Sequence, residues 1–120
     1  MANNLSMDDF VDQECTNLYI QHWDAHCRLR INSSNPKDFI DCEGYKNLVR
    51  CGKAGLPFIY QAVQEDKFDG RDFGWFNHIP RLIIDIVGDD FKVPKGIEYN
   101  VYERRDYAIN WLGDYVQKLD

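Results

Sequence analysis

Two histidines, His22 and His26, form the first group of side chains that could do chemistry. They are four residues apart on an expected helix, so both imidazoles lie on one face, and such a pair can bind zinc. The intervening Trp23-Asp24-Ala25 holds no glutamate directly after the first histidine, which a zinc-protease motif would require. The sequence indicates no third ligand. A small metal-dependent enzyme is therefore an alternative, and two solvent-facing imidazoles are the simpler interpretation.

A second group is a cluster of acids in and beside a polar, glycine-containing loop expected over residues 67–74. Its members are Glu65, Asp66, Asp69 and Asp72. A calcium loop does not fit, because placing Gly70 at its sixth position puts Lys67 at the third and Phe76 at the twelfth. A pair of catalytic carboxylates is the remaining enzymatic interpretation. A solvated acidic loop is the more common outcome of such a cluster.

Aromatic residues crowd the same segment. Four rings fall close together there: Phe68, Phe73, Trp75 and Phe76. Rings among polar groups are typical interface anchors, since a few buried aromatic side chains dominate the affinity of many interfaces. The alternative is that Trp75 and Phe76 cap the core while Phe68 and Phe73 fix the loop. The candidate binding residues are Asp66, Phe68, Asp69, Asp72, Phe73, Trp75 and Phe76, with Trp23 in the first helix as the next candidate.

The four cysteines, at positions 15, 27, 42 and 51, form no C-x-x-C pair. The chain opens with MANNLSMDDF, which has no apolar signal segment, and no run approaches the roughly 18 apolar residues of a membrane span. These features predict free thiols in a cytoplasmic protein without membrane association. No cofactor is indicated.

The composition is that of a single globular domain over residues 1–120. The formal net charge is −6, from 14 basic and 20 acidic residues, and Lys and Arg form no run. Direct nucleic-acid binding is therefore disfavoured, because it depends on clustered cations. Acidity serves solubility in general, and it also suits a partner protein with a basic surface.

The elements that position these groups are centred on two short helices, expected over residues 44–52 and 57–66. Gly52 follows the first apolar stripe and predicts its end, since glycine adopts positive φ readily. Pro57 suits the first turn of the second helix. The two helices therefore form an αα-hairpin with a short connection.

Further helices follow from caps and apolar spacing. We expect a first helix over 7–29, partly exposed around Trp23, and a short helical turn after the cap Asn35. An apolar run over 79–87 predicts another helix, with a buried strand as the competing interpretation. A last helix is expected over 101–118, after the cap Asn100. The fold class is accordingly all-α, a compact bundle of about five or six helices.

These features resemble a pattern found in small bacterial helical proteins to which no function is assigned. In that pattern a Tyr-x-x-Leu-Val-x-x-Gly helix runs into Leu-Pro and a second helix, and a Trp-Phe pair precedes an apolar helix. The corresponding residues here are Trp23, Tyr45, Leu48, Val49, Gly52, Leu56, Pro57, Trp75, Phe76, Gly88, Trp111 and Leu112. Gly55 departs from the pattern, which has alanine there. The resemblance implies a HEAT-like helical pair and implies no activity.

The function that these observations favour is a non-enzymatic protein-binding module. One specific form is an acidic inhibitor or immunity-type protein of a phage or mobile element, for example one that blocks a nuclease. The metal-dependent enzyme is the first alternative, and a self-associating structural subunit is the second. The sequence does not determine the oligomeric state.

Overall fold

The computed structural model describes residues 11–119, and its first helix begins at a side-chain cap. Helix α1 (Gln13–Leu29) follows Asp12, whose carboxylate accepts a hydrogen bond from the Cys15 backbone N–H at 2.8 Å. The expected start at residue 7 is wrong for the part that can be compared, because residues 11 and 12 are not helical. Residues 7–10 lie outside the described range.

The central hairpin is confirmed. Helix α2 (Glu43–Cys51) ends at Gly52, which has φ = 65°, and a 3-10 turn over Gly52–Gly55 leads into α3 (Leu56–Gln64). Leu48 in α2 and Ile59 in α3 are both fully buried. Each helix therefore buries the apolar stripe that the sequence predicts, and both helices pack against α1.

The second half of the chain is also helical, so the strand interpretation is wrong. Helix α5 (Ile79–Val87) ends at Gly88 with φ = 65°. The side chain of Asn100 caps α6 (Val101–Gln117) by accepting a hydrogen bond from the Glu103 N–H at 3.0 Å. The predicted loop over 67–74 is wrong as well, because it folds into a 3-10 turn (Lys67–Asp69) and the single-turn α4 (Gly70–Phe73). Further 3-10 turns are Pro36–Phe39, Trp75–His78 and Gly88–Asp90.

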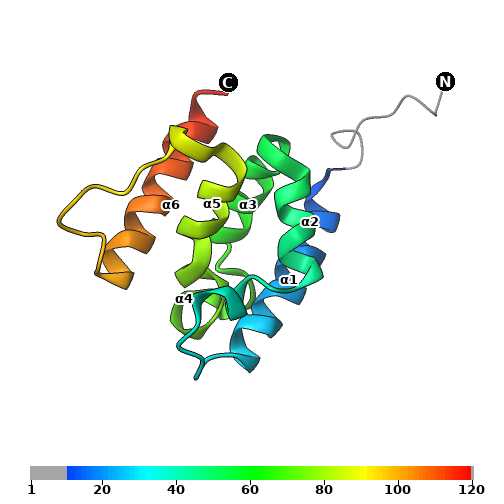
Figure 1. Ribbon diagram of the computed structural model, residues 1–120. Coiled ribbons are helices and arrows are strands. Elements are labelled where there is room, and N and C mark those ends of the chain that lie inside the picture. The colour runs from blue at the N-terminus through cyan, green and yellow to red at the C-terminus, as the bar shows by residue number, and fades with distance from the viewer. Residues whose placement is uncertain (1–10, 120) are drawn as a thin grey trace.

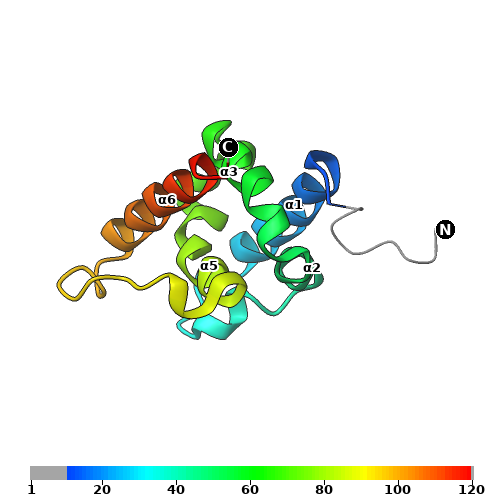
Figure 2. The same cartoon turned by 90° about the horizontal axis from the view of Figure 1, so that it is seen from above.

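The helices pack in a bundle with α3 and α5 at its centre. Figures 1 and 2 show α6 on one side of this pair and α1 with α2 on the other, and α1 packs most extensively against α2. The connection between α5 and α6 extends away from the body in both views. The residues from 11 to 119 contain no β-strand, so the predicted all-α class is confirmed.

One core runs through the bundle. Its fully buried large side chains come from every major helix and include Trp23, Leu48, Ile59, Trp75, Phe76, Leu82 and Leu112. All four cysteines are free. Within residues 11–119, no helix has both the length and the apolar character needed to cross a membrane.

Candidate functional site

The aromatic residues predicted as interface anchors lie inside the molecule. Trp23, Trp75 and Phe76 each have 0% of their surface exposed. The rings of Trp23 and Trp75 are 6.0 Å apart, and those of Trp75 and Phe76 are 4.8 Å apart in an edge-to-face pair. The first helix is exposed around Trp23, at His22 and Ala25, but Trp23 itself is not exposed, and these three rings build the core rather than a surface.

The rest of the predicted binding segment is divided between core and surface. Phe68 is half-buried and packs against the core, while Asp66 and Asp69 are exposed. Asp72 and Phe73 belong to α4, and their side chains lie outside the described part of the structure. Of the predicted binding residues that the structure describes in this segment, a partner can therefore reach the two exposed acids but neither of the fully buried rings.

This segment is held in a strained conformation by side chains of α1. Asp66, Phe68 and Asp69 all adopt the left-handed backbone region, with φ between 50° and 62°. Arg28 donates from Nη2 to the carbonyl oxygens of Phe68 at 2.6 Å and Asp69 at 2.9 Å. Its Nε also donates to the buried carboxylate of Asp24 at 2.9 Å. We call this arrangement the α1 clamp.

The clamp also explains the two glycines of the segment. Asp24 accepts a hydrogen bond from the Trp75 backbone N–H at 3.1 Å, which brings Gly74 against the same carboxylate. A Cβ at Gly74 would lie 1.8 Å from Asp24 Oδ1, and a Cβ at Gly70 would lie 2.4 Å from the Trp75 ring. Both positions therefore need glycine for close packing, and not for the flexibility that the sequence suggested.

The histidine and carboxylate groups considered for catalysis are dispersed. His22 is exposed, and His26 forms a hydrogen bond with the Asp38 carbonyl oxygen. Glu65 accepts a hydrogen bond from Gln61 at 3.1 Å, which lowers the pKa of its carboxyl group. Among the described residues, no three His, Cys, Asp or Glu side chains are placed to hold one metal ion. The enzyme alternative stays a prediction without a site in this part of the chain.

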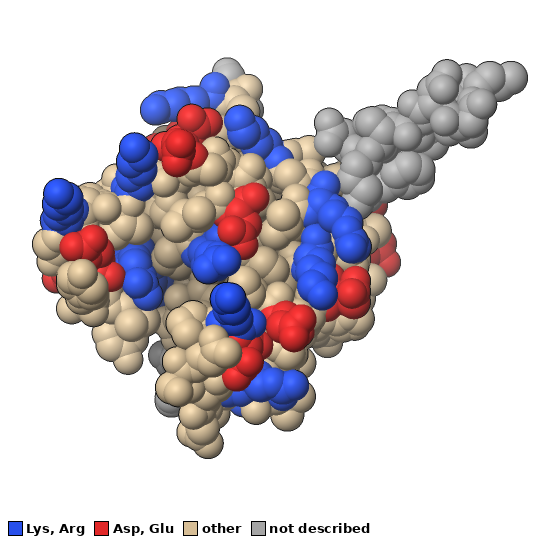
Figure 3. Space-filling view, viewed as in Figure 1, with Lys and Arg blue, Asp and Glu red and all other residues tan. Residues whose placement is uncertain are grey.

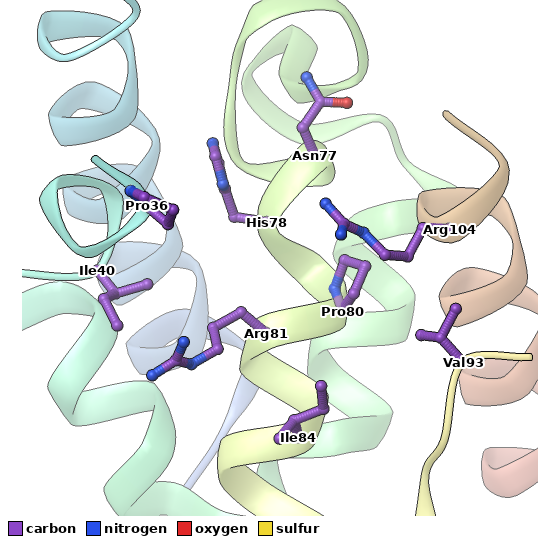
Figure 4. Close-up of a pocket in the computed structure, with 9 residues that line it drawn as sticks. All are labelled: Pro36, Ile40, Asn77, His78, Pro80, Arg81, Ile84, Val93 and Arg104. Carbon is purple, nitrogen blue, oxygen red and sulfur yellow. The ribbon is translucent and has the colours of Figure 1, made fainter. Parts of the chain in front are cut away.

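A cavity that the sequence did not indicate lies between α5, α6 and the Pro36–Phe39 turn (Figure 4). It encloses about 300 Å³ and is lined by Pro36, Ile40, Asn77, His78, Pro80, Arg81, Ile84, Val93 and Arg104. Arg104 reaches from α6 toward His78 and Pro80, while Arg81 points toward Ile40. Among the described residues, the lining contains two guanidinium groups and no carboxylate. It is therefore positively charged in a protein whose net charge is −6.

The two arginines of the cavity differ in how they are paired. Asp85 accepts from Arg81 Nε at 3.2 Å and also accepts a hydrogen bond from the Tyr45 hydroxyl, so a local anion balances Arg81. Arg104 is half-buried and donates from Nη1 to the Glu98 carbonyl oxygen at 3.1 Å. It forms no ion pair with any carboxylate whose position the structure describes. The charge of Arg104 is therefore balanced by no neighbouring side chain in the described protein.

His78 lies between the cavity and the core. Its ring stacks on Phe39 with the centroids 4.3 Å apart and the planes at 18°. Burial, and secondarily the charge of Arg104, lower the pKa of His78 from 6.5 to about 4. The imidazole is consequently neutral at pH 7, when it offers one N–H donor and one acceptor.

The cavity opens into a longer depression. Two neighbouring hollows share lining residues with it and with one another, namely Ile40, Lys46 and Arg81. We call the three together the α5 groove. Its charged lining residues are the cations Lys37, Lys46, Arg50, Arg81 and Arg104 and the acids Asp38, Asp41 and Asp85.

The groove therefore has an excess of cations, and apolar surface accompanies it. Ile84 is 42% exposed, while Val49 and Val93 are half-buried. Figure 3 shows Lys and Arg spread over this side of the molecule, with Asp and Glu beside many of them. Such a surface can bind an elongated ligand that is both anionic and apolar. No sequence pattern indicated it, because its cations come singly from five separate positions.

The chain matches no known protein-family model, no curated protein and no solved structure.

Proposed function

We propose that the protein is a non-enzymatic protein-binding module and that the α5 groove is its binding surface. The observation that carries the proposal is the half-buried guanidinium of Arg104, which has no ion-pair partner among the described residues and lies in a cavity whose described lining holds no carboxylate. Withdrawing a cation from water without a counter-charge is unfavourable, so a partner that brings an anion gains affinity there.

The groove has the mixed character of protein interfaces. Arginine is enriched in such interfaces, and apolar side chains in pockets act as anchors. Arg81 and Ile84 lie one turn apart on α5 and line the same cavity, so one partner segment can contact both. A protein segment is therefore a better match for the groove than a simple inorganic ion.

The charge of the groove bears on the kind of partner. The net charge of the chain suggests a partner with a basic surface, such as a nuclease blocked by an inhibitor of phage or mobile-element origin. The cations of the α5 groove favour an acidic segment on the partner instead. The inhibitor hypothesis is thus one specific form of the module, and a basic partner would bind a different face. The enzyme and self-association alternatives stay predictions.

The test is affinity capture from the native cell with two charge-reversed double variants. Lys46→Glu with Arg50→Glu changes two exposed groove cations on α2. Arg30→Glu with Lys118→Glu makes the same change in net charge at exposed positions outside the groove and is the matched control. Surface ion pairs contribute little to stability, so we expect both variants to fold.

Support would be a protein that wild type and the control retain and the groove variant loses, followed by direct binding between the two purified proteins. Equal capture by all three forms would show that the α5 groove is not the binding surface. Equal loss in both double variants would show that only net charge matters. The salt dependence of the purified pair should also weaken in the groove variant.

A further inference from the structure

The cavity at the α6 end of the α5 groove has a composition that indicates a more specific ligand. We infer that this cavity binds the C-terminal residue of a partner chain, with the free carboxylate on Arg104 and the aliphatic side chain against the apolar lining. The inference rests on the proposed function, because it names the group that the partner inserts.

Arg104 supplies a positive charge and guanidinium N–H groups that donate to no described residue. A guanidinium has five N–H donors, and in the described protein the Arg104 side chain donates only one hydrogen bond, to the Glu98 carbonyl oxygen. Arginine binds carboxylates through two parallel hydrogen bonds, a geometry that a point-charge ammonium does not offer. The remaining donors of Arg104 are therefore suited to a carboxylate entering from the cavity.

His78 adds a second donor beside Arg104. Its ring makes no hydrogen bond to another described residue, and its stacking on Phe39 fixes the plane of the imidazole. Because the ring is neutral at pH 7, it can donate to a carboxylate without adding a second desolvated charge. A bound anion would in turn favour the protonated ring and raise its pKa.

The apolar lining distinguishes among possible anions. Five of the lining residues present carbon rather than charge: Pro36, Ile40, Pro80, Ile84 and Val93. A phosphate group would leave this surface uncovered, and an internal aspartate or glutamate brings at most two methylene groups with its carboxylate. A C-terminal leucine or isoleucine carries a carboxylate and a branched side chain on one Cα. It therefore fits both halves of a cavity of about 300 Å³.

The experiment uses small probes and the full isotope-labelled chain, with backbone amide shifts recorded by NMR. N-acetyl-leucine is the minimal mimic of a C-terminal residue, and N-acetyl-leucinamide is the same molecule without the charge. We expect N-acetyl-leucine to saturate shifts in α5 and α6 and the amide to bind about tenfold or more weakly. N-acetylglutamate α-methylamide mimics an internal acid, and inorganic phosphate tests the anion alone. Both should bind more weakly than N-acetyl-leucine.

Variants then assign the effect to Arg104. Arg104→Gln should abolish the preference for the acid over the amide, and Arg104→Lys should retain part of it. Arg30→Gln, at an exposed position outside the cavity, should leave the preference unchanged. The preference in the wild-type chain is itself decisive, so the test stands even where a variant folds poorly.

Equal binding of acid and amide, tighter binding of phosphate or of the glutamate probe, or no binding at all would each overturn the inference. Failure here is distinct from failure of the proposed function. If the groove variant on α2 loses its partner while N-acetyl-leucine does not bind, the binding module stands and the C-terminal specificity falls. If N-acetyl-leucine binds but the groove variant captures the partner as well as wild type does, the cavity site stands and the proposed groove interface falls.

Discussion

His78 should make the stability of the fold depend on pH below neutrality. Burial and Arg104 lower the pKa of its ring from 6.5 to about 4 in the folded chain. The unfolded chain exposes the ring, which then titrates near its ordinary pKa. As the pH falls through 6.5 toward 4, the unfolded state binds a proton that the folded state excludes, so the folded state loses stability.

The size of the effect follows from these two pKa values. Between pH 7.5 and pH 5 the linkage relation gives a loss of about 2 kcal/mol in the free energy of unfolding from this one group. The assay is urea unfolding of wild type and His78→Gln at both pH values. Acidification should lower the free energy of unfolding of wild type by about 2 kcal/mol more than that of the variant, since all other titratable groups are the same in both proteins.

His22→Gln is the matched control, because that side chain is exposed. It should show the same loss on acidification as wild type. NMR titration of the His78 ring protons provides a direct reading. A ring pKa near 6.5, or an equal loss in wild type and His78→Gln, would refute the argument that burial against Phe39 and the charge of Arg104 exclude the proton.

Four further predictions concern the core, its connections and the cysteines. Leu48→Ala should lower the free energy of unfolding by about 2–5 kcal/mol, since the side chain is fully buried. Pro57→Ala should cost only about 0.4–1 kcal/mol, because proline in the first turn acts mainly on the unfolded chain. Equal losses of unfolding free energy in Leu48→Ala and Pro57→Ala, measured by urea unfolding, would contradict both predictions. Gly74→Ala should lower the free energy of unfolding by about 1–3 kcal/mol or more, since its Cβ would collide with Asp24. A Gly74→Ala variant as stable as wild type would contradict the packing described for the α1 clamp. In Ellman-type titration of the native chain, Cys27 should be the slowest thiol to react, because burial raises its pKa and only 1% of it is exposed. All four thiols should react after denaturation without reductant. Rapid reaction of Cys27 in the native chain, or fewer than four reactive thiols after denaturation, would refute this.

The helices were predictable because their signals are local. Asn35, Gly52, Pro57 and Asn100 each act within one turn of their own position, as caps, a stop or a first-turn residue, and the structure confirms all four. The helix over 79–87 was also predictable, since no other strand candidate existed to pair with it. Local chemistry therefore determines most of the boundaries in this chain.

The connector over residues 66–74 was mispredicted because its structure depends on distant side chains. Its glycines and acids are typical of a polar loop, yet hydrogen bonds to Asp24 and Arg28 of α1 fix its conformation. Trp75 was placed correctly in only one of the two interpretations, the one in which it caps the core. Composition alone could not choose between them, since both need a large ring beside polar residues.

The cavity was missed for a different reason. Arg81 and Arg104 belong to different helices, and neither stands in a cluster or motif along the chain. What distinguishes Arg104 is that it has no ion-pair partner among the side chains that the structure describes. A property of that kind exists only after the helices have packed, and a scan of residue types along the chain cannot detect it.

The α1 clamp joins segments of the chain that are synthesised at different times. Asp24 leaves the ribosome 51 residues before Trp75, and Arg28 leaves 40 residues before Phe68. During that interval α1 and the central hairpin have been translated, but Trp23 lacks the Trp75 ring that later packs beside it. A nascent chain shorter than this therefore exposes a large aromatic surface together with the Asp24 carboxylate. Translation speed over residues 66–74, and any chaperone that meets the nascent chain there, should therefore influence the yield of folded protein.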